Sequence, residues 1–207
     1  MGKNALRLAK IAETISVKRN VSVSVAPQIA DLFQVSKMVK IPVFAQHIDP
    51  IEAGRNTGYI LPENVKASGA QGTLINHSEH QLSEDKIKLT IERARNVGLL
   101  SLVCVDTPKM ACQVARFKPD MIAIEPHELI GTGISVSKAK PEVITLGLQS
   151  VKEIDPEIIF LCGAGISSGE DAASSIKLGA KGVLLASGFV KSKNPSQVLE
   201  EIALAIL

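Results

Sequence analysis

The chain has 207 residues, enough for one domain with a sizeable hydrophobic core. Its hydrophobic fraction is 45%, its charged fraction 21% and its formal net charge +2, which argues against a disordered chain and gives no electrostatic reason to expect nucleic acid. Aromatic residues make up only 3%, so stacking platforms for bases are not expected either. Because no linker or low-complexity segment interrupts the chain, we predict a single domain over residues 1–207.

The cysteines and the hydropathy pattern indicate a soluble protein in a reducing compartment. Cys104, Cys112 and Cys162 have no short metal-ligand spacing and are odd in number, which favours structural thiols. No run approaches the roughly 20 apolar residues that span a bilayer. We therefore expect a cytoplasmic protein without a metal site, a nucleic-acid partner or a membrane partner.

The chain opens on a helical pattern at residues 4–15 and then alternates apolar runs with helical stretches. Most runs are continuously apolar, which is typical of parallel strands covered on both faces. The seven predicted strands are residues 21–27, 43–48, 72–78, 101–106, 121–126, 158–165 and 182–187.

Three further helices have clear signals. Residues 85–98 place Ile87, Ile91 and Ala94 on one face and end at a glycine. Residues 170–179 begin with acidic side chains, which the helix dipole favours. Residues 195–207 close the chain with apolar residues at helical spacing.

This alternation predicts an α/β protein, either an open doubly wound sheet or a closed (β/α) barrel. An eight-stranded barrel needs one more strand, which would precede the helix at residues 4–15. The sequence therefore leaves two options: an open sheet, or a barrel lacking its first β-strand.

Functional groups of such folds gather where the strands end. The run GTLINHSEH delivers Asn76, His77, Ser78 and Glu79 from a buried strand. A histidine at this place can polarise a carbonyl or move a proton, although a packed structural histidine fits the pattern as well.

Glu125 closes the apolar run MIAIEP, directly before a proline. A carboxylate is costly to bury unless it is paired, so this residue needs an explanation. A general base is one, and a structural ion pair is the other.

Glycines follow the last three strands. Gly131 and Gly133 suit either an anion-binding lid or a plain turn. Gly163 and Gly165 precede a helix, and Ala186, Ser187 and Gly188 end the last strand. Because barrels of this kind bind phosphate with the loops after their last two strands, the two segments together predict a phosphate site formed by backbone N–H groups.

Taken in order, the segments resemble the triosephosphate isomerase family, in particular its archaeal branch. The matching pieces extend from about residue 21 to the end of the chain: VSVAPQ, VFAQHIDP, NTGYI, LINHSEH, AIEPHELIGTG, SKAKPE, CGAGISSGEDA and GVLLASGFVK. The resemblance implies a (β/α)8 barrel that interconverts dihydroxyacetone phosphate and D-glyceraldehyde 3-phosphate in glycolysis and gluconeogenesis, without a cofactor.

The resemblance also assigns roles. Glu125 would be the proton acceptor, His77 the neutral electrophile and Glu79 a carboxylate beside the histidine. Ile130, Gly131, Gly165, Ala186 and Ser187 would bind the substrate through its phosphate, and residues 126–133 would form a closing lid that excludes water. The segment NTGYI matches the family's intersubunit loop, which implies a homodimer or homotetramer.

Two features depart from the family pattern. His127 stands where archaeal members usually have a second proline. The family's Asn-aromatic-Lys motif, which ends its first strand, has no match, since Lys3 and Asn4 read as the opening of a helix. We therefore expect a barrel that lacks the first strand and its catalytic lysine in this sequence, with impaired activity. The alternatives are another phosphate-binding barrel, such as a synthase of the indole or thiamine pathways, and an inactive phosphate-binding barrel that serves as an assembly partner.

Overall fold

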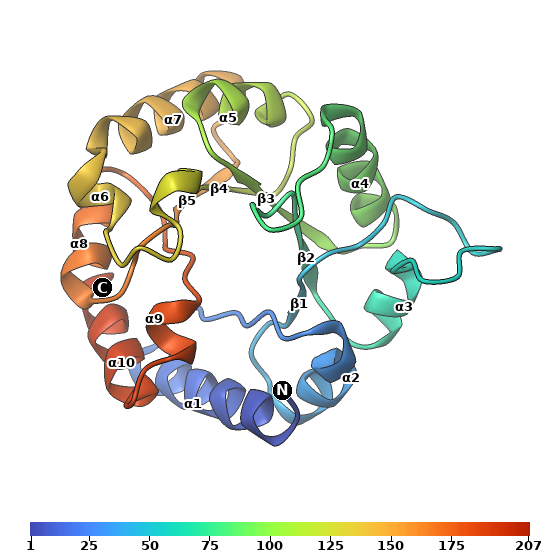
Figure 1. The fold of residues 1–207 in the computed structure, drawn as a ribbon, viewed down its shortest axis with the longest axis horizontal. Helices are drawn as coiled ribbons and strands as arrows, with labels where there is room; N and C mark the ends of the chain where they lie inside the picture. The colour runs from blue at the N-terminus through green and yellow to red at the C-terminus, as the bar shows by residue number, and fades with distance from the viewer.

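The computed structural model describes residues 1–207 and contains one parallel sheet. Its strands pair in sequence order, and Figure 1 shows the helices as an outer ring around them. A doubly wound sheet reverses its strand order at a switch point, whereas a (β/α) barrel does not. The sheet therefore has barrel topology. Its strands are β1 (Phe44–Ala45), β2 (Gly72–Ile75), β3 (Leu100–Val105), β4 (Met121–Ile124) and β5 (Ile159–Cys162).

All seven predicted strand segments lie in this sheet in the predicted order, but only five form regular strands. Residues 21–27 join β1 through a single bridge between Val25 and Val43, and residues 182–187 join β5 through one between Cys162 and Val183. Each end segment pairs with a neighbouring strand on one side only, so it forms a single bridge instead of a longer ladder of hydrogen bonds. No backbone hydrogen bond connects the two end segments to each other, so hydrogen bonds do not close the sheet into a full ring.

The helices pack around the sheet and against their neighbours. α1 lies beside α10, and α10 lies beside α8, so the first and last helices of the chain are neighbours (Figure 1). The helices are α1 (Lys3–Arg19), α2 (Ile29–Met38), α3 (Pro62–Ala67), α4 (Glu84–Asn96), α5 (Pro108–Ala115), α6 (Val136–Ala139), α7 (Pro141–Ile154), α8 (Gly169–Lys177), α9 (Ser187–Val190) and α10 (Pro195–Ala205), with one 3-10 turn, η1 (His127–Leu129).

The helix predicted over residues 85–98 shows how local signals set these elements. It is α4, and the three residues predicted for its inner face are all buried. The Ser83 hydroxyl caps it by accepting the N–H of Lys86. Gly98 follows with a φ of +73°, a conformation that glycine adopts without strain.

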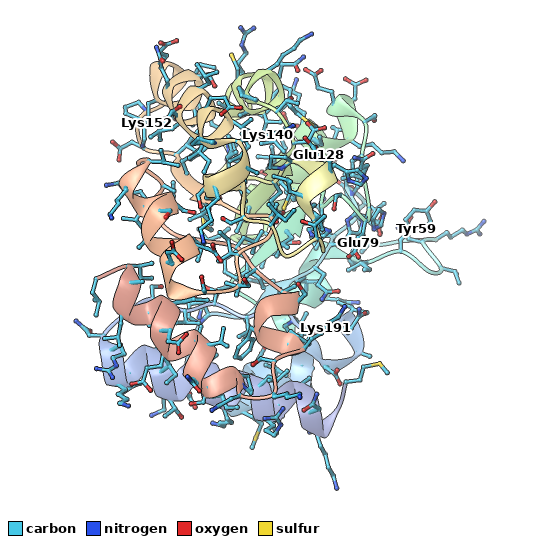
Figure 2. All side chains as sticks on the ribbon, turned by 60° about the vertical axis from the view of Figure 1, so that its left-hand side comes forward. Tyr59, Glu79, Glu128, Lys140, Lys152 and Lys191 are labelled. Atoms are coloured by element: carbon cyan, nitrogen blue, oxygen red, sulfur yellow. The ribbon has the colours of Figure 1, made fainter.

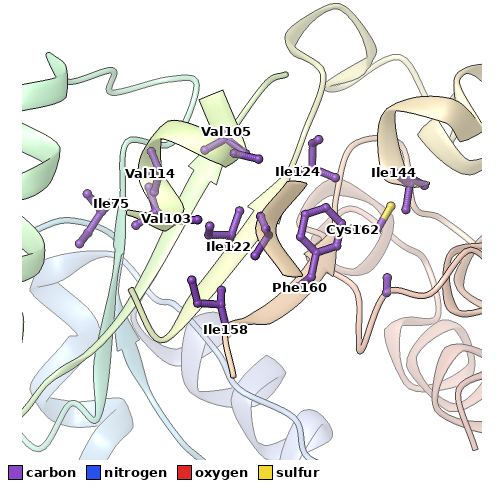
Figure 3. Packing of buried hydrophobic residues seen from close by; sticks show 14 of the residues in the cluster. Ile75, Val103, Val105, Val114, Ile122, Ile124, Ile144, Ile158, Phe160 and Cys162 are labelled. Carbon is purple, nitrogen blue, oxygen red and sulfur yellow. The ribbon is translucent and has the colours of Figure 1, made fainter. Parts of the chain in front are cut away.

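The main core lies between the sheet and the outer helices (Figure 3). Ile122, Ile124 and Phe160 of β4 and β5 are fully buried, as is Ile144 of α7. A side chain at Gly147 would come within 2.8 Å of Ile124, so the glycine allows α7 to approach the sheet closely. Each of these large apolar side chains contributes about 1.5–3 kcal/mol by its removal from water. The packing holds the carboxyl ends of β4 and β5 in fixed positions.

None of the helices is both long and apolar enough to cross a membrane. Cys104 and Cys162 are buried, Cys112 is half-buried, and all three are free thiols.

Candidate active site

The carboxyl ends of β2 and β4 bring together the two side chains predicted to do chemistry. His77 lies in the loop after β2, and Glu125 follows the last residue of β4. Nε2 of His77 is 3.9 Å from Oε2 of Glu125. The histidine side chain is 27% exposed and the glutamate side chain only 8%. Glu125 is therefore the buried member of the pair, and His77 is the member that solvent reaches.

The hydrogen-bond partner of Nδ1 determines the tautomer of His77. The backbone N–H of Glu79 donates to Nδ1 at 3.3 Å. A neutral imidazole accepts at one nitrogen and donates at the other, so the hydrogen lies on Nε2 and faces Glu125. His77 can therefore donate a hydrogen bond into the site without carrying a charge.

Glu79 acts on His77 through its backbone more than through its carboxylate. Its Oε2 lies 3.7 Å from Nδ1, but the side chain is 86% exposed. Figure 2 shows Glu79 at the outside of the molecule. The family resemblance implies a carboxylate beside the histidine, and in the structure the backbone N–H of Glu79 is the group that contacts the ring.

Asn76 holds the histidine loop in place, a role that sequence reasoning did not assign. It has a φ of +61°, which asparagine tolerates better than most residues. Its Nδ2 donates to the carbonyl of Cys104 at 2.8 Å, and its Oδ1 accepts the N–H of Leu82 at 2.8 Å. Its side chain thereby spans both ends of the loop and ties it to β3. A buried asparagine that ends a strand directly before a histidine is the signal that could have revealed it.

Glu125 is held in a form suited to proton transfer. Burial raises the pKa of its carboxyl above the ordinary value of 4.5, while His77, the Cys104 thiol and the Ala164 backbone partly oppose the shift. Its Oε2 accepts no hydrogen bond. A carboxylate with a raised pKa and a free lone pair is a stronger base than one on the surface.

Gly163 makes room for this carboxylate. A Cβ at Gly163 would lie 2.3 Å from Oε1 of Glu125 and 2.5 Å from its Cγ. The sequence analysis named Gly163 only as part of a predicted phosphate loop, and its contact with the Glu125 carboxylate is an additional role.

The predicted lid, residues 126–133, connects β4 to α6. It contains η1 and two glycines in the left-handed region, Gly131 and Gly133, with φ near +75°. Nothing lies within 4 Å of a Cβ at either glycine, so this part of the loop stands free of its surroundings. An ion pair between Glu128 and Lys140 anchors the loop at its outer side (Figure 2). The N–H of Ile130 donates to the carbonyl of His127 at 3.2 Å, so it becomes available to a ligand only when the loop changes conformation.

The loops that follow the last two predicted strands, residues 158–165 and 182–187, lie against each other. Some of their backbone N–H groups have no acceptor. A Cβ at Gly188 would come within 2.8 Å of the carbonyl of Ile166, which shows how closely the loops approach. The backbone N–H groups of Gly165, Ala186 and Ser187 donate to no acceptor within the protein. Ala186 and Ser187 are exposed. Neighbouring N–H groups of this kind attract anions.

Gly165 packs closely against the segment that follows the lid. It has a φ of +70°, and a Cβ there would lie 1.9 Å from the carbonyl oxygen of Ile134. Any other residue would therefore collide with Ile134, directly after the lid.

A cavity of about 210 Å³ opens beside Glu125, between the loops that follow β2, β3 and β4. His127 lines it, together with Asn76 and Asp106, and no lysine or arginine does. No three His, Cys, Asp or Glu side chains lie close enough together to hold a metal ion.

The strands pair in sequence order, as in a (β/α)-barrel protein, and their carboxyl ends bring an imidazole to face a buried carboxylate. Comparison with known proteins identifies the family. The sequence model of triosephosphate isomerase matches residues 1–203, so the chain belongs to the triosephosphate isomerase family. This membership confirms the predicted resemblance and argues against a synthase of the indole or thiamine pathways.

Curated relatives agree with the family model. The chain is 48% identical over 202 residues to the triosephosphate isomerase of Methanocaldococcus jannaschii, covering 98% of this chain and 92% of the relative. It is 47% identical to that of Methanothermus fervidus, covering 97% and 90%. It is 44% identical to that of Methanosarcina mazei, with the same coverage. These relatives confirm the predicted similarity to the archaeal branch.

Proposed function

We propose that this chain interconverts dihydroxyacetone phosphate and D-glyceraldehyde 3-phosphate through an enediolate. The observation that carries the proposal is the facing pair of Nε2 of His77 and Oε2 of Glu125, in a chain of this family. Glu125 removes the proton from the carbon next to the carbonyl, and the electron pair moves to the carbonyl oxygen. The Nε2–H of His77 stabilises that oxygen, which takes up a proton while the hydroxyl on the adjacent carbon loses one and becomes the new carbonyl. Glu125 returns its proton to the former carbonyl carbon.

The other predicted residues support this chemistry. The free N–H groups of Gly165, Ala186 and Ser187 hold the phosphate, and those of Ile130 and Gly131 join them when the lid closes. Closure excludes water and protects the enediolate. No cofactor is needed, because the carbonyl of the substrate itself makes the transferred proton acidic.

We further propose that the protein works as one domain in the cytoplasm and as a homodimer or homotetramer. Residues 50–59 project from the molecule with the Tyr59 side chain 61% exposed (Figure 2). An exposed aromatic side chain on a projecting loop suits contact with a second copy of the chain.

The turnover of residues 1–207 alone should be low. The family's Asn-aromatic-Lys motif has no match in these 207 residues, so no lysine is assigned to stabilise the charge of the enediolate. Loss of one such stabilising group costs on the order of a hundredfold in rate. The same observation favours the second candidate, an inactive phosphate-binding barrel.

Isomerisation and proton exchange of glyceraldehyde 3-phosphate separate the two. They are measured for the wild-type chain and for Glu125→Gln, each with and without a peptide that carries the family's first strand. Turnover that requires Glu125 and rises with the peptide supports the isomerase. Binding of inorganic phosphate without turnover in any sample supports the inactive barrel.

A further inference from the structure

A second histidine lies near the site without belonging to the catalytic pair. His47 follows β1 and is only 7% exposed. Its Nε2 lies 3.3 Å from Oδ1 of Asp49. Asp49 in turn closes the projecting loop, because its N–H donates to the carbonyl of Ile60 at 3.0 Å and its Oδ2 accepts the N–H of Ile60 at 2.7 Å. One side of the imidazole is thus tied to a structured loop.

The face of the His47 ring contacts the loop that carries His77. It stacks on His80, with ring centroids 4.1 Å apart and an angle of 26° between the planes. The N–H of His80 donates to the carbonyl of His77 at 2.7 Å, which closes a turn over residues 77–80. The stack therefore connects the loop after β1 to the turn that presents His77.

The surroundings of His47 favour its neutral form. Burial lowers the pKa of His47, Asp49 partly raises it, and the neighbouring His80 lowers it again. Asp49 and His80 are the titratable groups that act on it. A neutral ring can stack on His80 without the repulsion between two cations, so the contact is favourable at neutral pH.

We propose that His47 is a positioning residue for the catalytic histidine. Its ring, stacked on His80, holds the turn in which the Glu79 N–H meets Nδ1 of His77, and so keeps the hydrogen of His77 on Nε2. The catalytic consequence rests on the proposed isomerase function. The effect on the tautomer does not, because it concerns the free protein.

Two variants separate the ring stack from the polar contact. His47→Phe keeps an aromatic ring against His80 but loses the bond to Asp49. His47→Gln keeps a polar group near Asp49 but loses the ring. Gln46→Ala is the matched control: it removes a hydrogen bond of the neighbouring residue in the same loop, from Nε2 of Gln46 to the carbonyl of Ala26.

The first measurement is the ¹⁵N spectrum of the imidazole groups at pH 7.5. The chain has four histidines, and His77→Asn assigns the signal of His77. We expect the Nε2–H tautomer in the wild type, His47→Phe and Gln46→Ala, and a mixture of tautomers in His47→Gln. The Nε2–H tautomer alone in a folded His47→Gln would overturn the proposal.

The second measurement is the steady-state kinetics of the same variants with glyceraldehyde 3-phosphate. We expect His47→Gln to lower kcat on the order of tenfold, because a misplaced catalytic group loses rate steeply. KM should stay unchanged, since the phosphate is held by other loops, and His47→Phe should restore most of kcat. An equal loss in His47→Phe and His47→Gln, or a loss confined to KM, would contradict the positioning role. A wild type without turnover, both with and without the first-strand peptide, would refute the proposed function, and the ¹⁵N spectrum would still decide on His47.

Discussion

The contact between Gly163 and Glu125 gives the sharpest test of how the base is placed. We predict that Gly163→Ala removes most of the activity and leaves the fold intact. Gly163 does not have a positive φ, so alanine is compatible with its backbone. The new methyl group would instead lie 2.3 Å from Oε1 of Glu125.

The size of the effect follows from this distance. An ordinary contact needs about 3.4 Å, so the carboxylate must move by about 3.4 − 2.3 = 1.1 Å. A displacement of about 1 Å at a catalytic group costs on the order of a hundredfold in rate. We therefore expect kcat/KM to fall about a hundredfold.

The assay is isomerisation of glyceraldehyde 3-phosphate, with the unfolding temperature measured alongside. Gly182→Ala is the matched control, because its methyl group would meet only the mobile end of Leu161, at 3.1 Å. It should keep both the activity and the unfolding temperature. A Gly163→Ala protein with kcat/KM within threefold of the wild type would refute the placement of Glu125.

Three other predictions concern titration and local anchoring. The raised pKa of Glu125 means that the folded chain binds more protons than the unfolded chain between pH 4.5 and the folded pKa, so stability falls as pH rises through that window. Glu125→Gln should accordingly unfold less easily than the wild type at pH 8, by about 1–3 kcal/mol, and similarly to it at pH 4, as thermal unfolding would show. Asp171 caps α8 by a capping box with Ser168, and Asp171→Ala should cost about 1–2 kcal/mol in chemical unfolding. Burial raises the pKa of Asp171, but Lys138 and Ser168 outweigh it and hold the pKa below 3.8, so this contribution should be present at neutral pH and disappear as pH falls below that value. If His77 acts as proposed, Asn76→Ala should lower kcat about tenfold with little effect on KM, because the loop that carries His77 loses both of its anchoring bonds.

Much of the fold was accessible from the sequence because its signals are local. The continuous apolar runs marked the strand positions, and the spacing of Ile87, Ile91 and Ala94 marked α4. The alternative of a doubly wound sheet was left open, since strand order depends on long-range pairing. The end segments were predicted as full strands and form single bridges, because a pattern of residues does not show how many partners a strand has.

The candidate site was partly accessible for the same reason. His77 and Glu125 each interrupt an apolar run at a strand end, which is visible in one dimension. The contact of Gly163 with Glu125 joins residues 38 positions apart in the chain. The stack of His47 on His80 spans 33 positions. The positive φ of Asn76 is a backbone property that its neighbours impose. None of these features produces a periodic pattern of residues, so the sequence alone did not reveal them.

Deuterium incorporation during isomerisation in D2O, measured for the chain with the first-strand peptide and for its Glu125→Gln variant, shows whether Glu125 transfers the proton. We expect glyceraldehyde 3-phosphate to be converted and deuterium to appear at the carbon next to the carbonyl, and we expect Glu125→Gln to abolish both. Conversion that persists without Glu125 would contradict the proposed mechanism, as would a folded chain that binds phosphate and neither converts nor exchanges the substrate.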